Sequence, residues 1–127
     1  QIIAAKTGRL EQVMREELLP NCLADSPFKA HIFELMVDMA LSLGPEVFAR
    51  QSRALQKRRD QQSLLCNIKC PTLVLCGAQD QITLPKRHTF MAELIAPAVL
   101  VVIENAGHLP TLEQPEATIS ALRAWLG

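Results

Sequence analysis

Two runs of consecutive apolar residues in the second half of the chain predict buried strands. The first run covers residues 73–76, between Pro71 and Gly77, and the second covers residues 98–103. Unbroken aliphatic runs of this length are typical of parallel strands that are covered on both faces. We therefore expect neither strand to have a solvent-exposed side.

The residues around these runs predict helices. Residues 84–95 carry apolar positions at helical spacing and form a crossover helix, which makes the two strands parallel and places their carboxyl ends at one edge of the sheet. A last helix opens at Pro115, and its apolar stripe is expected to pack on the strands. That stripe consists of Ile119, Leu122, Trp125 and Leu126.

The first half of the chain has helical periodicity. Residues 1–19 predict a helix divided at Gly8, a second helix begins at Ser26 and ends at Gly44, and a third opens at Pro45. We expect the apolar residues of these helices to form a core of their own. The residues expected in this core include Phe28, Ile32, Leu35, Met36, Met39, Leu43 and Phe48.

The change of pattern near residues 60–68 divides the chain into a helical segment, residues 1–63, and a strand–helix segment, residues 64–127. The second segment alternates strands with helices, so the predicted fold class is α/β. The chain length of 127 residues suffices for a hydrophobic core.

Charge and hydropathy exclude several classes of partner. Lys plus Arg and Asp plus Glu both number 13, so no net charge attracts nucleic acid, and the basic residues at 50–59 are interleaved with polar ones as on a solvated helix face. A nucleic-acid-binding regulator is therefore disfavoured. No apolar run approaches the roughly 20 residues that cross a bilayer, and no signal peptide is evident. We expect a cytoplasmic protein with neither nucleic-acid nor membrane partners.

The cysteines predict neither a disulfide framework nor a metal site. Cys22, Cys66, Cys70 and Cys76 lack a paired C-x-x-C pattern, which favours reduced structural thiols. Cys66, Cys70 and His88 lack the second close-spaced ligand pair that would complete a zinc site. We expect no metal and no cofactor.

One acid and one histidine follow the predicted strands, at the sheet edge where parallel sheets usually carry their active sites. Asp80 follows the first apolar run and His108 follows the second, so both lie beyond the carboxyl ends of parallel strands and should be neighbours. A carboxylate bonded to one nitrogen of a histidine fixes its tautomer and stabilises its cation. Each residue alone also fits an ordinary turn or loop; the other histidines, His31 and His88, are expected to be structural or solvated.

At these residues the sequence resembles a known family. Residues 70–83 (CPTLVLCGAQDQIT), 104–109 (ENAGHL) and 112–115 (LEQP) resemble the last two strands, acid turn, histidine loop and closing helix of α/β-hydrolases. The resemblance covers residues 64–127, while residues 1–63 are similar in kind to the helical cap of many members. It implies that Asp80 is the catalytic acid and His108 the catalytic base. The residues leading into Pro71 resemble bacterial ester and enol-lactone hydrolases.

The nucleophile of such a hydrolase is absent from these residues. It is expected on a sharp turn of sequence G-x-S-x-G, and no glycine brackets a serine in that way. Because the members of a triad act as a unit, we expect a chain cut from a longer enzyme, inactive by itself. Haloalkane, epoxide or carbon–carbon bond hydrolysis, acyl transfer and a non-catalytic interaction module remain alternatives on the same scaffold.

The resemblance also implies a small-molecule substrate. We expect an apolar, ester-like substrate, and flexible Met36 and Met39 are candidates to line an acyl pocket under the cap. If the chain stands alone, its first strand keeps an unpaired edge, which favours a homo-oligomer through that edge or through the cap.

Overall fold

The computed structural model describes residues 1–127, which form two compact units. Residues 1–20 and 30–59 make unit 1, and residues 21–29 and 60–127 make unit 2. The division into residues 1–63 and 64–127 stays a prediction; in the structure, residues 21–29 and 60–63 belong to unit 2. For residues 21–29 the reason is their hydrogen bonds to the loop after the second strand, described below. The role of the helical part as a cap stays a prediction.

Unit 1 is helical, and its breaks fall at the two predicted glycines. The helices are α1 (Ile2–Ala4), α2 (Leu10–Gln12) and α3 (Lys29–Lys57), with π-helical turns η1 (Ala5–Arg9) and η2 (Val13–Leu18). Gly8 and Gly44 interrupt them with φ of 87° and 80°, a conformation that glycine adopts without strain. Helix α3 begins at Lys29, not at Ser26 as predicted, because Ser26 forms a turn whose carbonyl accepts the Lys29 N–H at 3.2 Å.

The predicted apolar core of the helices is wrong for much of α3. Ile32 is buried, but Met39 keeps 55% of its surface exposed, and Phe28, Leu35 and Leu43 are exposed as well. Val37 is fully buried and lies on the opposite side of the helix from Met39, at 100° per residue. On the side of Val37, Glu34 accepts hydrogen bonds from Arg15 of η2 at 2.7 and 2.8 Å.

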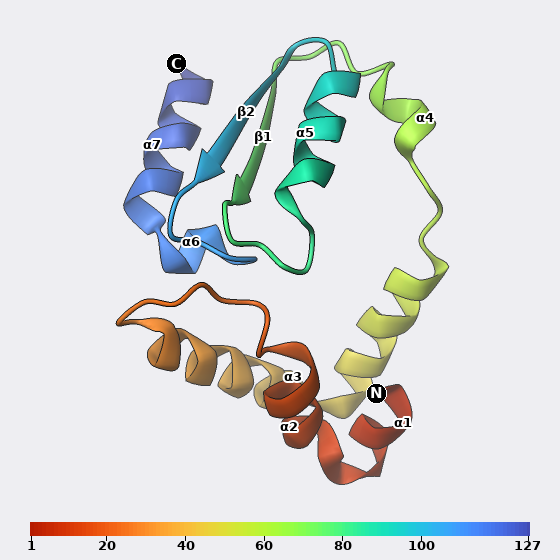
Figure 1. Cartoon of the computed structure of the whole chain (residues 1–127). Helices are drawn as coiled ribbons and strands as arrows, with labels where there is room; N and C mark the ends of the chain where they lie inside the picture. The colour runs from red at the N-terminus through yellow and green to blue at the C-terminus, as the bar shows by residue number, and fades with distance from the viewer. The chain divides into compact units, whose positions relative to one another are not determined.

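Unit 2 contains the two predicted parallel strands. β1 (Thr72–Gly77) pairs with β2 (Ala98–Ile103), and Leu73 lies opposite Val99. The crossover helix α5 (Pro85–Leu94) and the last helix α7 (Pro115–Leu126) contact both strands from opposite faces of the sheet (Figure 1). Short helices α4 (Gln62–Leu65) and α6 (Pro110–Glu113) precede β1 and α7. The predicted strands, crossover helix and parallel pairing are confirmed.

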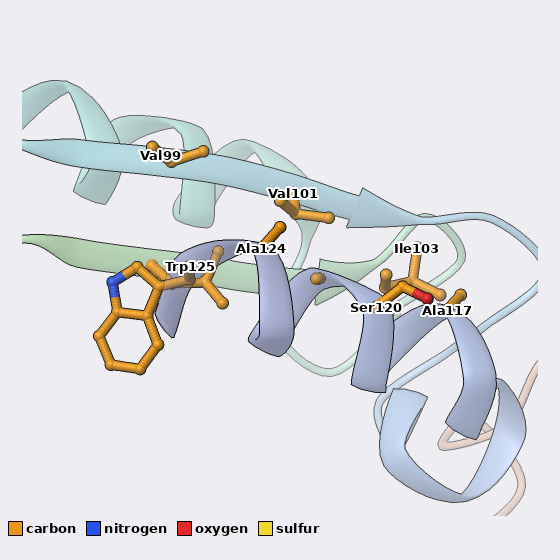
Figure 2. A pocket seen from close by; sticks show the side chains of 9 residues that line it. Val99, Val101, Ile103, Ala117, Ser120, Ala124 and Trp125 are labelled. Carbon is orange, nitrogen blue, oxygen red and sulfur yellow. The ribbon is translucent and has the colours of Figure 1, made fainter. Parts of the chain in front are cut away.

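The expectation that both strands are fully covered is wrong for β2. Val99 keeps 58% of its surface exposed, and the predicted apolar stripe of α7 is also exposed. Between α7 and the sheet lies an open apolar groove with a volume of about 440 Å³ (Figure 2). Helix α7 lines this groove with the small residues Ala117, Ala121 and Ala124, which do not fill it, and with Trp125 of the predicted stripe.

Two further features of the structure concern its helices and its cysteines. None of the helices is both long enough and apolar enough to cross a membrane. All four cysteines are thiols, of which Cys22 and Cys76 are buried while Cys66 and Cys70 are exposed.

Candidate active site

The turn after β1 and the loop after β2 are joined by backbone hydrogen bonds. The Ala78 N–H donates to the Ile103 carbonyl at 2.8 Å, and the Gln79 N–H donates to the Ala106 carbonyl at 2.9 Å. These bonds extend the contact between the strands beyond their carboxyl ends. They bring Asp80 and His108 to the same edge of the sheet.

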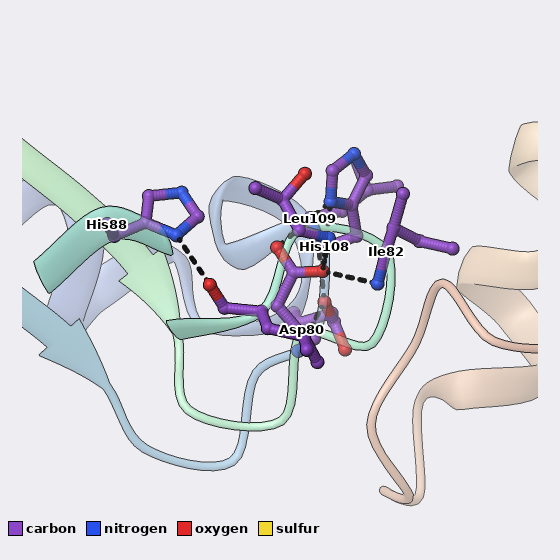
Figure 3. Close-up of polar contacts among 9 residues, drawn as sticks. Asp80, Ile82, His88, His108 and Leu109 are labelled. Carbon is purple, nitrogen blue, oxygen red and sulfur yellow. Dashed lines mark hydrogen bonds and ion pairs between the residues drawn. The ribbon is translucent and has the colours of Figure 1, made fainter. Parts of the chain in front are cut away.

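Asp80 and His108, which were predicted to be neighbours, are hydrogen-bonded. Nδ1 of His108 lies 3.0 Å from Oδ2 and 3.1 Å from Oδ1 of Asp80 (Figure 3). The Asp80 side chain is only 5% exposed, whereas that of His108 is 38% exposed. Because Nδ1 faces the carboxylate, Nε2 lies on the far side of the ring from Asp80.

The Asp80 carboxylate is held in its ionised form. Its Oδ1 accepts the backbone N–H groups of Ile82 and Thr83, each at 2.9 Å. Burial acts to raise the pKa of Asp80, but the hydrogen bonds from Thr83, His108 and Ile82 outweigh it and hold the pKa below its ordinary value. An ionised partner of this kind orients an imidazole and stabilises its protonated form.

Two glycines permit the close approach of the segments that carry the pair. A Cβ atom on Gly77 would collide with the backbone carbonyl oxygens of Ala106 and Gly107. A Cβ atom on Gly107 would lie 2.6 Å from the Cys22 carbonyl oxygen. The sequence marks both positions as turn glycines, but the backbones that approach them are evident only in the folded chain.

Sequence reasoning assigned no role to two features that hold the histidine loop. The His108 N–H donates to the Cys22 carbonyl at 2.7 Å, and the buried Glu113 carboxylate accepts backbone N–H groups from Ala24 and from both neighbours of His108. The only signal for Glu113 is its place in the segment at 112–115 that carries the family resemblance. Nothing in the sequence signals the contribution of residues 22–24.

The remaining candidate groups stay apart from the pair. His31 is exposed, and Nδ1 of His88 lies 3.4 Å from the Leu84 carbonyl oxygen (Figure 3). Burial, and then the nearby charge of Asp80, raise the pKa of the Cys22 and Cys76 thiols, which disfavours their thiolates. No group of three or more His, Cys, Asp or Glu side chains is placed to hold a metal ion.

Known proteins are similar to this chain in sequence and in fold. No family model matches the chain. The 3-oxoadipate enol-lactonase 2 of Acinetobacter baylyi is 34% identical over 105 residues, which are 83% of this chain and 38% of that protein. A thermophilic esterase from Thermogutta terrifontis is 38% identical with a TM-score of 0.82, covering 96% of this chain and 49% of that one. The chain belongs to the α/β-hydrolase fold family.

Two further proteins are similar to this α/β-hydrolase-fold chain, one in sequence and one in fold. A pimeloyl-[acyl-carrier protein] methyl ester esterase of Neisseria meningitidis serogroup C is 34% identical over 114 residues, 90% of this chain and 43% of that protein. The enol-lactonase of Burkholderia xenovorans LB400, at 21% identity, shares the fold with a TM-score of 0.86 over 98% of this chain and 48% of that one. The chain thus spans about half the length of the solved relatives it matches.

Proposed function

We propose that this chain contributes the acid and the base of a hydrolase that acts on carboxylic esters or lactones. The observation that carries the proposal is the geometry of the pair, in which buried Asp80 faces Nδ1 and leaves Nε2 of the partly exposed His108 side chain free of the carboxylate. Relatives named as esterases and enol-lactonases support the substrate class.

In this proposal His108 is the general base. Its Nε2 takes the proton of a hydroxyl nucleophile as that nucleophile attacks the acyl carbon, and later returns it to the leaving group. Asp80 stays ionised and stabilises the imidazolium that forms between the two steps. The nucleophile comes from outside residues 1–127, so we expect these residues alone to have almost no hydrolytic activity.

The test requires a longer polypeptide that contains these residues together with a candidate nucleophile. We expect it to hydrolyse p-nitrophenyl esters and to be labelled by a fluorophosphonate. His108→Ala should lower kcat by about 1,000-fold or more, because triad members act together. His31→Ala, at an exposed histidine of unit 1, is the matched control and should retain activity.

Other outcomes separate the alternatives. Hydrolysis of haloalkanes, epoxides or carbon–carbon bonds, or acyl transfer, without ester or lactone hydrolysis would reassign the reaction while keeping the acid and base. Full activity of His108→Ala, or no turnover of any of these substrates, would favour a non-catalytic module on the same scaffold.

We propose that the helical segment acts as a cap over an apolar acyl site and that Met36 and Met39 line it. Met39 is exposed and Met36 half-buried, so each is accessible to a ligand. In the longer polypeptide, Met39→Glu should lower kcat/KM more for esters with long acyl chains than for acetate esters. Equal kcat/KM ratios in the variant and the parent would remove Met39 from the site.

We also propose that the 127-residue chain associates with itself when it stands alone. β1 and β2 form a two-stranded sheet, so each strand has one edge without a partner strand. Exposed strand edges beside apolar surface favour pairing with another copy. Light scattering after size-exclusion chromatography should give at least twice the mass of 14.1 kDa, and a monomer at high concentration would contradict the proposal.

A further inference from the structure

Glu113 is a buried carboxylate that the proposed reaction does not use. Its side chain belongs to the last residue of α6 and is one of three buried polar side chains in the chain, with 7% of its surface exposed. Oε1 accepts the Ala24 N–H at 2.6 Å. Oε2 accepts the N–H groups of Gly107 and Leu109 at 2.9 and 3.0 Å. Burying a carboxylate is costly, and hydrogen bonds from several donors offset that cost.

The donors to Glu113 flank the histidine on both sides. Gly107 and Leu109 donate to the same oxygen, and the N–H of His108 between them donates to the Cys22 carbonyl at 2.7 Å. Three consecutive amide groups are thereby fixed, two by Glu113 and one by the segment that Glu113 itself holds through Ala24. The backbone of His108 therefore has little freedom to rotate, and its imidazole is aimed at Asp80.

We infer that Glu113 is a positioning residue that sets the orientation of His108 by clamping residues 107 and 109 to residues 22–24. The inference rests on the proposed function only in giving His108 the role of base; the clamp itself is a statement about geometry. The Glu113 carboxylate forms no hydrogen bond with the imidazole or with Asp80. It acts through the backbone of the loop.

The chemistry of the clamp requires a carboxylate. Both oxygens of Glu113 face N–H donors, so each must accept. The amide of Gln in the same place has one oxygen and one NH2 group. It can satisfy either Ala24 or the pair Gly107 and Leu109, and it sets a donor against the other N–H groups. Glu113→Gln is therefore nearly isosteric and still breaks the clamp.

The experiment uses nuclear magnetic resonance on the isotope-labelled 127-residue chain and needs no activity. In the unaltered chain, scalar couplings across the hydrogen bonds should join the amide nitrogens of Gly107 and Leu109 to the Glu113 carboxylate carbon. In Glu113→Gln, amide exchange at Gly107 and Leu109 should accelerate by roughly tenfold or more relative to the strand amides. The His108 Nδ1–H resonance, which reports the bond to Asp80, should shift and broaden.

Two variants serve as controls. Glu116→Gln removes an exposed acid from the first turn of α7 and should change neither signal. Thr118→Ala removes a buried hydroxyl that donates to the Pro110 and Gln114 carbonyls at 3.0 and 2.9 Å. It should destabilise α6 and α7 while leaving the His108 Nδ1–H resonance in place.

The outcomes decide the inference separately from the proposed function. An unchanged Nδ1–H resonance in Glu113→Gln, or the same change in Thr118→Ala, would overturn the positioning role. If Glu113→Gln does not fold, the couplings in the unaltered chain decide: their presence supports the clamp and their absence overturns it. A longer polypeptide that lacks hydrolase activity would contradict the proposed function and leave these measurements standing.

Discussion

Two regions of the sheet in unit 2, its carboxyl edge and its face under α7, differ in how completely the chain supplies partners for their side chains. At the carboxyl edge of the sheet, the polar groups of Asp80 and Glu113 find all their partners within the chain, and no buried side-chain nitrogen or oxygen lacks a hydrogen bond. On the face under α7, apolar side chains border an open groove. Hydrogen bonds are short and directional, so a few nearby groups complete them, whereas apolar burial requires area.

The largest effect is expected where the carboxyl edge is packed most tightly. Gly77→Ala should lower the free energy of unfolding by about 3 kcal/mol, because its Cβ atom would collide with the backbone of residues 106 and 107. Urea denaturation measures the change. Gly127→Ala is the control: its Cβ atom would meet no atom within 4 Å, but its φ of 90° strains any residue other than glycine, so it should cost about 1 kcal/mol. A stable Gly77→Ala chain would show that the edge is looser than the backbone contacts indicate.

The two faces of the sheet can be compared with a matched pair of valines on adjacent strands. Val74 is buried on the face toward α5, and Val99 is exposed on the groove face. Val74→Ala should cost about 2 kcal/mol, and Val99→Ala about 0.5 kcal/mol or less, again by urea denaturation. Equal costs would mean that the groove is covered in solution. Since self-association would cover it, the comparison belongs at low protein concentration.

The smallest effect is the contribution of Asp80 to the dependence of stability on pH. The pKa of Asp80 in the folded chain lies below its ordinary value, since hydrogen bonds outweigh the opposing effect of burial. The resulting stabilisation is fully present above about pH 4 and is lost as the pH falls through the lowered pKa. Asp80→Asn should flatten this acid limb in a series of denaturation curves, whereas Asp38→Asn, at an exposed position, should retain it.

Local patterns predicted the elements of unit 2 closely. The apolar run at 98–103 coincides with β2, and Pro115 opens α7 as expected from the preference of proline for the first turn. The proximity of Asp80 and His108 was predictable as well, because strands joined by a crossover helix are parallel and have their carboxyl ends at one edge of the sheet. These predictions rest on local patterns, namely the apolar runs, the proline at a helix start and the direction of the chain, which the sequence shows directly.

The extent to which each apolar face is buried was not predictable from the same patterns. An apolar stripe, as on α3 or α7, indicates that a face is apolar and does not indicate how much partner surface the fold provides. Met39 and Val99 are exposed for that reason, although both belong to patterns typical of buried elements. The clamp escaped prediction for a different reason, since Ala24 and Glu113 are 89 positions apart.

The sequence by itself determined that this chain carries two parallel strands with an acid and a histidine at their ends, because hydrophobic periodicity and chain direction are local properties. Only the tertiary structure decided how that histidine is held. Glu113 reaches three amides from two segments distant in sequence, and such a contact exists only once the backbones of residues 22–24 and 107–109 have come together.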